Sequence, residues 1–204
     1  RQAWPYLFES EANVVQEGTT LEIMAEDLGN PTCLHWADEN WLLVCDKEGK
    51  ILALNLVDEV FSSPITVLDN LNSPHGTLYW IDTNSSARIF VSQSGMLQAW
   101  DILSGDNPSN WELSNPQTLI EGVATGNHQQ NSIMLGISGK LIWHSGSTCN
   151  ACEEEDWRSA TLLEVDPWTG NHTLLATGVR NSYDGVWVPE MGYVFTDNGR
   201  DWLG

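Results

Sequence analysis

"GTLYWIDTNSSARIFVSQSGMLQAWDI", residues 76–102, contains three short apolar runs separated by two small polar turns. The runs cover residues 76–82, 87–93 and 96–102, and they are rich in the aromatic and branched side chains that fit a pleated surface. Gly, Asn and Ser interrupt nearly every pattern that would suit a helix. The stretch therefore predicts three consecutive β-strands joined by short turns.

The same order of loop and strands recurs along the chain. Residues 28–56 repeat it, residues 125–166 repeat it around a cysteine-containing insertion, and residues 177–199 begin it again. A period of roughly 40–50 residues with about four short strands per unit indicates a β-propeller. The loops that open the units recur at intervals of 43, 54 and 54 residues, at Asn30, Ser73, Asn127 and Asn181.

The sequence thus predicts a single all-β domain over residues 1–204, a β-propeller of which about three and a half blades are present. Blades stack face to face and cannot stand alone, and propellers close with four to eight of them. We therefore expect a truncated part of a larger ring; a four-bladed ring fits less well, because the last unit lacks its outer strands. Residues 1–20 show no repeat and are expected to be an entry strand or a frayed end. The expected units are about 21–60, 61–120, 121–176 and 177–204.

The charge balance excludes several classes of partner. The chain carries 28 acidic and 8 basic residues, which gives a formal net charge of −20. Nucleic-acid backbones and anionic membrane surfaces are bound by clustered Lys and Arg, so we expect neither as a partner. No run of 18 apolar residues is present, and no membrane span is expected.

Three polar loops, residues 126–132, 178–185 and 196–204, flank apolar strands and are candidates for a site. In propellers such loops gather at one end of the central channel, so we expect them to converge. An imidazole suits a general base, an Arg beside an Asn suits an anionic ligand, and a Gly-containing acidic loop can turn carbonyls toward calcium. Taken singly, each of these residue types more often has a structural role.

Residues 126–204 hold several motifs in order, among them "HQQNSIMLG", "CNACEEEDWRSATLL", "GVRNSYDG" and "TDNGRDWLG". On these motifs the chain resembles the soluble sugar dehydrogenases that depend on pyrroloquinoline quinone (PQQ), the glucose/sorbosone dehydrogenase family. Between residues 21 and 102 only the blade pattern and "LNSPHG" agree. The resemblance implies a six-bladed propeller, PQQ and Ca²⁺ as cofactors, a sugar substrate and an external electron acceptor. The implied reaction oxidises an aldose or a related sugar at the anomeric carbon, with hydride transfer to the quinone.

The resemblance implies roles for three residues on the substrate side. His128 matches the general base that takes the proton of the anomeric hydroxyl. Asn127 and Gln129, its neighbours, are the implied substrate-binding residues. Relatives often carry an acid at the position of Asn127, so the charge that would orient the base or the sugar is lost here.

On the cofactor side, the resemblance implies that Arg180 and Asn181 contact the oxygens of the quinone, and that Asn198 also binds the cofactor. Arg180 would stabilise the negative charge that develops as the quinone is reduced. Gly199 and Arg200 match the positions whose backbone carbonyls hold calcium, and that ion would polarise a quinone carbonyl.

The sequence departs from the family in three respects. The common turn "GPDGKLY" reads "GISGKLI" here, although Gly139 keeps the residue that a tight turn needs most. His144 replaces a usual apolar residue and is expected to be a strand-end residue, not a second base. The family's further cofactor-gripping basic residues lie in later blades, so the chain alone is expected to be inactive.

Two other functions remain open. Enzyme-derived families can keep the fold and lose the activity, so a non-catalytic propeller that binds a protein or a glycan is one alternative. A calcium-dependent lactonase-like propeller is the other, to which Asp184 and Asp197 could contribute ligands.

Cys149 and Cys152 precede four consecutive acids, and the spacing alone is compatible with a metal site, a redox pair or a disulfide. Zinc needs three or four suitable ligands, and no second Cys or His pair at zinc spacing is present. The resembling family carries this motif in a propeller loop, which implies a loop-tightening disulfide and a periplasmic or secreted protein. Cys33 and Cys45, in neighbouring strands, could pair or remain buried thiols.

Overall fold

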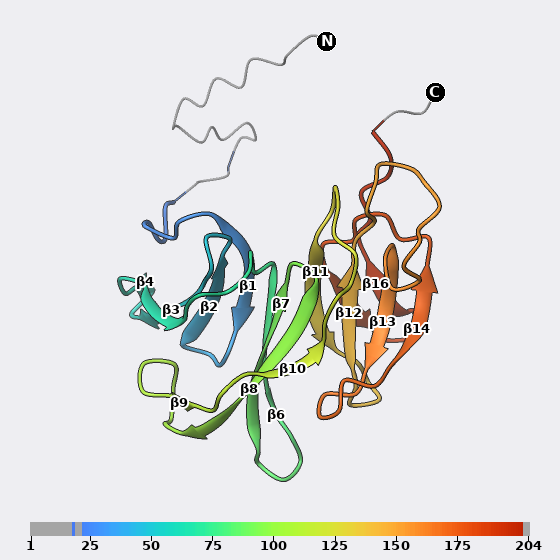
Figure 1. Cartoon of the computed structure of the whole chain (residues 1–204). Helices are drawn as coiled ribbons and strands as arrows, with labels where there is room; N and C mark the ends of the chain where they lie inside the picture. The colour runs from blue at the N-terminus through green and yellow to red at the C-terminus, as the bar shows by residue number, and fades with distance from the viewer. Residues whose placement is uncertain (1–17, 19–21, 202–204) are drawn as a thin grey trace.

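The structure is a computed structural model that describes residue 18 and residues 22–201. Apart from residue 18, the expectation of an entry strand or frayed end within residues 1–20 lies outside this range. Within the described residues, every element of regular secondary structure is a β-strand, and the strands form four separate sheets (Figure 1). No helix over the described residues has the length and apolar character needed to cross a membrane.

Each sheet is a blade whose strands follow one another in the chain. The first contains β1 (Pro31–Trp36), β2 (Trp41–Asp46), β3 (Lys50–Val57) and β5 (Ile65–Leu68), with the short β4 (Val60–Phe61) paired to the end of β3. The second contains β6 (Gly76–Ile81), β7 (Ala87–Gln93), β8 (Met96–Ser104) and β10 (Gln117–Ile120), with the short β9 (Glu112–Leu113) on β8. The third contains β11 (Gln130–Leu135), β12 (Leu141–Ser145), β13 (Thr161–Val165) and β14 (His172–Thr177), and the fourth contains β15 (Gly185–Val188) and β16 (Gly192–Phe195).

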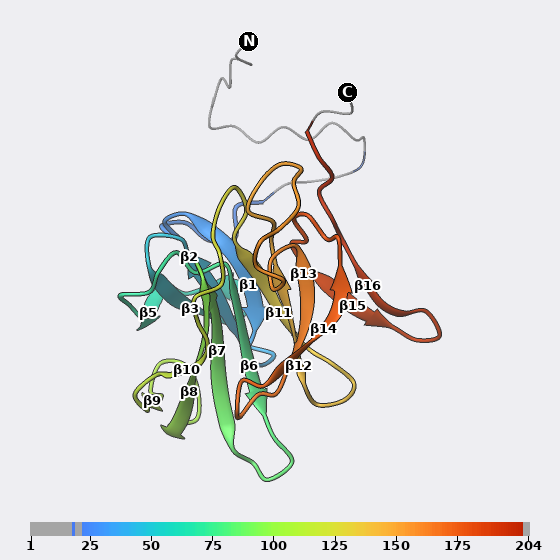
Figure 2. The same ribbon diagram turned by 45° about the vertical axis from the view of Figure 1, so that its right-hand side comes forward.

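The first strand of each blade lies innermost. β1 contacts β6, β6 contacts β11, and β11 contacts β15, so the four sheets fan out from one line of inner strands (Figures 1 and 2). This is the radial arrangement of a β-propeller, and it confirms the predicted fold of about three and a half blades. One expected limit is wrong: the first unit does not end near residue 60, because β5 hydrogen-bonds to β3 and completes the first sheet.

Both faces of the middle blades are buried, which follows from the alternation of side chains along a strand. In β7, Ile89 and Val91 pack toward the first blade, whereas Phe90 between them packs toward the third. In β12, Trp143 packs toward the second blade and Ile142 toward the fourth. A strand buried on both faces reads as a continuous apolar run, as these strands do.

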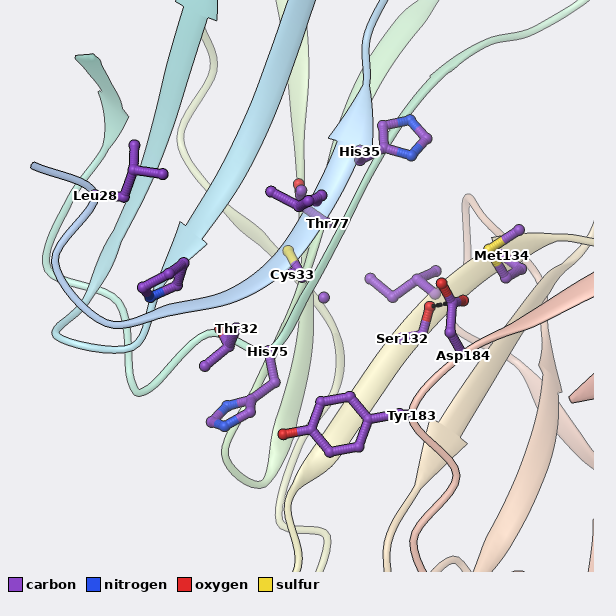
Figure 3. Close-up of a pocket in the computed structure, with 14 residues that line it drawn as sticks. Leu28, Thr32, Cys33, His35, His75, Thr77, Ser132, Met134, Tyr183 and Asp184 are labelled. Carbon is purple, nitrogen blue, oxygen red and sulfur yellow. Dashed lines mark hydrogen bonds between the residues drawn. The ribbon is translucent and has the colours of Figure 1, made fainter. Parts of the chain in front are cut away.

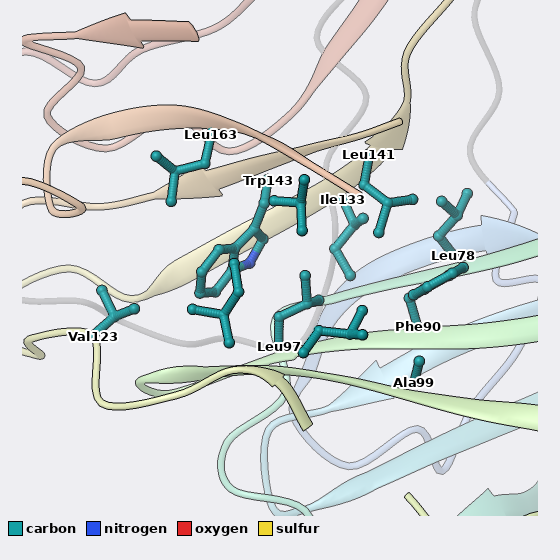
Figure 4. Close-up of a cluster of buried hydrophobic side chains, with 12 residues drawn as sticks. Leu78, Phe90, Leu97, Ala99, Val123, Ile133, Leu141, Trp143 and Leu163 are labelled. Carbon is teal, nitrogen blue, oxygen red and sulfur yellow. The ribbon is translucent and has the colours of Figure 1, made fainter. Parts of the chain in front are cut away.

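The largest apolar cluster lies between the second and third blades, and Trp143 is its largest side chain (Figure 4). The indole is fully buried, and its Nε1–H donates a hydrogen bond of 2.8 Å to the hydroxyl of Ser92 on the neighbouring blade. The interface therefore combines apolar burial with a satisfied polar contact. The cluster comprises Leu78, Phe90, Leu97, Ala99, Leu119, Ile120, Val123, Ile133, Leu141, Trp143, Leu163 and Val165.

Replacing Trp143 by Ala is expected to lower the free energy of unfolding by about 3–5 kcal/mol, because it leaves a large cavity between two blades. Urea denaturation of the full-length protein would measure the loss. Trp157→Ala is the matched control: this indole is 56% exposed, and its loss is expected to cost less than about 1 kcal/mol. Equal losses in the two variants would contradict the assignment of this interface.

Candidate functional site

The antiparallel order of each blade brings two kinds of loop to the same end. The first residue of each inner strand pairs with the last residues of the second strand, as Pro31 does with Asp46 and Gly185 with Phe195. The loop that enters each blade therefore lies beside the connection between its second and third strands. In the third and fourth blades this end is the upper one in Figure 1.

A repeated hydrogen bond marks equivalent positions in three blades. The backbone N–H of Asn30 donates to Asp46 Oδ1, that of Asn72 to Gln93 Oε1, and that of Asn181 to Asp197 Oδ1. The equivalent residue of the second blade is thus Asn72, one position before the Ser73 that the sequence predicts. In the third blade the entering chain instead pairs directly with the cysteine-containing loop.

Ser147 in that loop lies between the two main predicted residues. Its backbone N–H donates to the carbonyl of Arg180 at 2.8 Å, and its carbonyl accepts from the N–H of His128 at 3.2 Å. The predicted convergence of residues 126–132 and 178–185 is therefore present. Asn127 also pairs with this loop, through its N–H and the carbonyl of Thr148, and its side chain is exposed. Gln129 is half-buried, and its carbonyl accepts from Gly146.

The hydrogen bonds around His128 determine which ring nitrogen carries the proton. Nδ1 lies 2.8 Å from Ser147 Oγ and 3.1 Å from the Ser147 carbonyl oxygen. The Ser147 hydroxyl donates its own hydrogen to the carbonyl of Cys149 at 2.7 Å, so its oxygen acts as an acceptor toward the ring. Two acceptors facing Nδ1 require an N–H there, which leaves the lone pair of the neutral imidazole on Nε2.

Arg180 is held by two loops. Nε donates to the carbonyl of Asn150 at 2.8 Å, and Nη2 donates to Asn150 Oδ1 at 2.6 Å and to Asp201 Oδ2 at 3.1 Å. Nη1 donates to the carbonyl of Asn198 at 3.0 Å. These contacts use four of the five guanidinium N–H groups, and the side chain is only 13% exposed. Arg180 is therefore a loop anchor, and one N–H remains for a ligand.

The loop after β16 completes this end of the site. Both carboxylate oxygens of Asp197 accept backbone N–H groups, from Arg180 and from Asn181. The N–H and side-chain amide of Asn198 donate to the carbonyl of Asn181. Gly199 and Arg200 are exposed, and their carbonyls accept no hydrogen bond from the described residues. Carbonyl oxygens are a ligand type that a hard cation such as calcium takes, and these two would supply part of the roughly 6–8 that calcium uses.

Disulfides join Cys149 to Cys152 and Cys33 to Cys45. The first is the predicted loop disulfide, and the second settles the open alternative in favour of pairing. Cys149, Cys152 and Glu154 lie close together, but the bonded sulfurs leave no thiolate for a metal.

Two of the four acids that follow the cysteines, Glu154 and Asp156, have structural roles. Glu154 accepts the N–H and the hydroxyl of Thr148, at 3.0 and 2.6 Å. Asp156 pairs with Arg158, whose hydrogen bond holds the pKa of that carboxyl down at about 2. Arg158 also donates to the carbonyls of Glu121 and Gly122, which ties the loop to the chain that leaves the second blade.

His144 is fully buried between the third and fourth blades. Its Nδ1 lies 2.7 Å from the Ser182 hydroxyl and its Nε2 lies 2.6 Å from the Tyr193 hydroxyl. Burial lowers the pKa of His144 to about 4, against the opposing effects of the Asp184 charge and a Ser182 backbone contact. Burial also raises the pKa of Tyr193. Because both ring nitrogens are occupied, His144 is no second base, as the sequence predicts, although it lies in the core.

Asn131 is a second buried support of the same segment. Its Nδ2 donates to Asn181 Oδ1 at 2.9 Å and to the Ser182 carbonyl at 2.8 Å. Sequence reasoning missed Asn131, Ser147 and Asn150 as contributors to the site. Their only sequence signal is a position next to predicted residues, since the contacts join segments far apart in the chain.

A cavity of about 540 Å³ opens along the inner strands, where the central channel of a propeller runs (Figure 3). His75 and Tyr183 point toward one another at one end of it, and Ser132 donates a hydrogen bond of 2.7 Å to Asp184 on its wall. Burial lowers the pKa of His75, whose Nδ1 lies 2.8 Å from the Ser73 carbonyl. Leu34, Ile133 and Met134 contribute apolar side chains to its lining.

Comparison with solved structures identifies the same architecture. The PQQ domain of a pyranose dehydrogenase from Coprinopsis cinerea, in its holo form, superposes with a TM-score of 0.69 at 17% identity, over 87% of this chain and 46% of that one. A Trichoderma reesei enzyme of carbohydrate-active family AA12 gives 0.71 at 19%, over 88% and 48%. A putative glucose dehydrogenase from Thermus thermophilus gives 0.56 at 14%, over 84% and 58%.

The chain therefore has the fold of the PQQ-dependent sugar dehydrogenases, as the sequence resemblance predicts. It spans about half the length of the first two structures. No protein-family profile and no curated protein sequence matches it.

The buried His144 is expected to make the fold sensitive to acid. The unfolded chain takes up a proton on this imidazole below its ordinary pKa of 6.5, whereas the folded chain does so only near 4. Stability from this group is therefore present above pH 6.5 and is lost as the pH falls toward 4, by up to about 3 kcal/mol. Urea denaturation between pH 4 and 7 should show a shallower pH dependence for His144→Gln than for the parent. Identical slopes would contradict the prediction.

Proposed function

We propose that this chain is part of a PQQ-dependent sugar dehydrogenase that oxidises an aldose or a related sugar at the anomeric carbon. The observation that carries the proposal is the arrangement around Ser147. It leaves Nε2 of His128 as a proton acceptor and joins the same segment to Arg180. A base with a fixed lone pair, joined through one residue to a half-buried cation, suits removal of a proton from a substrate whose hydride leaves toward an anionic acceptor.

The residues that would act on the sugar and those that would hold the quinone lie on opposite sides of Ser147. His128 Nε2 takes the proton of the anomeric hydroxyl, and Asn127 and Gln129 beside it contact the sugar. The chemistry that PQQ would supply, when bound, is that of an acceptor for the hydride of the anomeric carbon. The lone pair on Nε2 is the acceptor for this proton.

Arg180, Asn181 and Asn198 would hold the quinone. Arg180 offers its remaining N–H and a charge that four hydrogen bonds keep in place. Asn181 is held by Asn131 through Oδ1, so its own amide N–H groups are available. The free carbonyls of Gly199 and Arg200 would bind Ca²⁺, a Lewis acid for the quinone carbonyl.

The fold likeness supports this assignment, since one superposed structure is a PQQ domain in its holo form and another is called a putative glucose dehydrogenase. Because the chain spans about half of the longer structures, the remaining cofactor contacts and the activity itself are assigned to the whole propeller. An external acceptor would reoxidise the quinone. Two disulfides favour a periplasmic or secreted location.

The lactonase alternative gains no support from the two acids that it needs. Asp197 uses both carboxylate oxygens on backbone N–H groups, and Asp184 accepts from Ser132 and from Gly185 through Oδ1, so only its Oδ2 remains for a metal. A non-catalytic binding propeller would keep the loops without needing a fixed lone pair on His128, and the following experiment separates it from the enzyme.

Dye-linked oxidation of aldoses by the full-length protein, supplied with PQQ and Ca²⁺, is the test. His128→Ala is expected to lower kcat by about 10²–10⁴-fold while quinone binding is retained, because only the proton acceptor is removed. His172→Gln, a half-buried imidazole stacked on Trp157, is the control and should leave kcat unchanged. No turnover of any sugar, with the quinone demonstrably unbound, would refute the proposal; full activity of His128→Ala would refute the role of this base.

A further inference from the structure

The four-residue ring closed by Cys149 and Cys152 carries a contact that the proposed function leaves unexplained. Asn150, inside the ring, accepts from the Arg180 guanidinium twice, at its backbone carbonyl and at Oδ1. Its Oδ1 also accepts the N–H of Asp201, at 3.1 Å. One asparagine thus joins the guanidinium to the loop that would hold calcium.

The other end of the same segment contacts the base. Ser147 Oγ lies between His128 Nδ1 and the carbonyl of Cys149, so the position of Cys149 determines where that hydroxyl points. Thr148 is fixed by Glu154, and a side chain on Gly126 would overlap the Thr148 carbonyl. These contacts restrict the movement of Ser147 and Thr148, which lie next to His128. The disulfide restricts the movement of Asn150, which contacts the Arg180 guanidinium.

We propose that Asn150, held in the Cys149–Cys152 ring, is the positioning residue of Arg180. The ring thereby fixes the position of the Arg180 guanidinium relative to the His128 imidazole. This inference deepens the proposed function and rests on it. Asn150 itself touches neither sugar nor quinone in this assignment. It acts through Arg180, by presenting two acceptors to adjacent N–H groups of a planar guanidinium.

The physical reason lies in the freedom of a long side chain. An arginine loses the freedom of several rotatable bonds when it is fixed, so its orientation depends on acceptors that are themselves fixed. Without the ring, the carbonyl and side chain of Asn150 could turn independently. Arg180 would then move toward the exposed carboxylate of Asp201, which is 67% exposed, and away from the remaining position for a ligand.

The test uses the full-length protein labelled with ¹⁵N at arginine and histidine. Asn150→Ala removes the Oδ1 acceptor of Arg180 Nη2, so it is expected to speed hydrogen exchange at Arg180 Nη2. It is also expected to raise the Kd for PQQ about tenfold, the usual effect of losing a hydrogen bond to a charged group. Asn150→Asp keeps an acceptor at the same place and should restore slow exchange. The ¹⁵N shifts of His128 should stay those of the Nδ1–H tautomer in both variants.

Removing the ring with Cys149→Ser and Cys152→Ser should change both signals, since Ser147 and Asn150 both depend on it. The matched control replaces the other disulfide with Cys33→Ser and Cys45→Ser, in the first blade. That variant is expected to lower the midpoint of thermal unfolding while leaving Arg180 exchange and the His128 tautomer unchanged. Circular dichroism identifies any variant that has lost the fold.

Unchanged Arg180 exchange in both Asn150→Ala and the Cys149/Cys152 variant would overturn the inference, and so would equal effects of the two disulfide removals. These signals need no sugar and no quinone. If the parent binds no PQQ but the exchange pattern is as expected, the positioning role stands and the proposed function fails. If PQQ binds equally well to the parent and to Asn150→Ala, the proposed function stands and the positioning role fails.

Discussion

The burial of both faces of the two middle blades is the constraint on which this structure depends. A blade has two apolar faces, and each is covered only when another blade lies against it. Trp143 shows the consequence in one residue: its ring fills the space between two blades, while Ile142 beside it faces the next. The inner strands must then converge, and the loops that enter them must gather at one end. The position of the site thus follows from the packing of strands that take no part in it.

Polar groups between the blades keep this packing specific. Trp143 donates to Ser92 across one interface, and His144 joins Ser182 and Tyr193 across the next. Arg88, almost fully buried, pairs with Asp101 on its own blade and donates to the Pro167 carbonyl on the third. Trp143, His144 and Arg88 each have a defined partner on a neighbouring blade, which penalises any other register between these blades. The neutral state of His144 contributes to this specificity, because burying a charged imidazole away from water would cost free energy.

The sequence predicts the strands, which depend on the alternation of neighbouring side chains. It does not predict the contacts between residues that are far apart in the chain. The strands around residues 76–102 follow from their own side chains, and β6 to β8 begin and end within two residues of the expected limits. The repeat in the sequence places β5 in the second unit, which is wrong, because a short, half-buried strand carries no sign of which sheet it joins. The Cys33–Cys45 pair required the register of β1 on β2, which places the two residues opposite one another. His128 and Arg180 came from resemblance, whereas Ser147 and Asn150 are recognisable only once those two are seen on either side of them.

The third blade explains why a fold likeness alone says little about chemistry here. The connection between the second and third strands is residues 47–49 in the first blade and 94–95 in the second, but residues 146–160 in the third. Strands tolerate replacement of most residues while they remain apolar, which is why structures of 14–19% identity still superpose. The long connection has no such freedom, because its backbone pairs with His128 and Arg180 on opposite sides. A function assigned to this protein therefore depends on whether that one segment keeps its geometry.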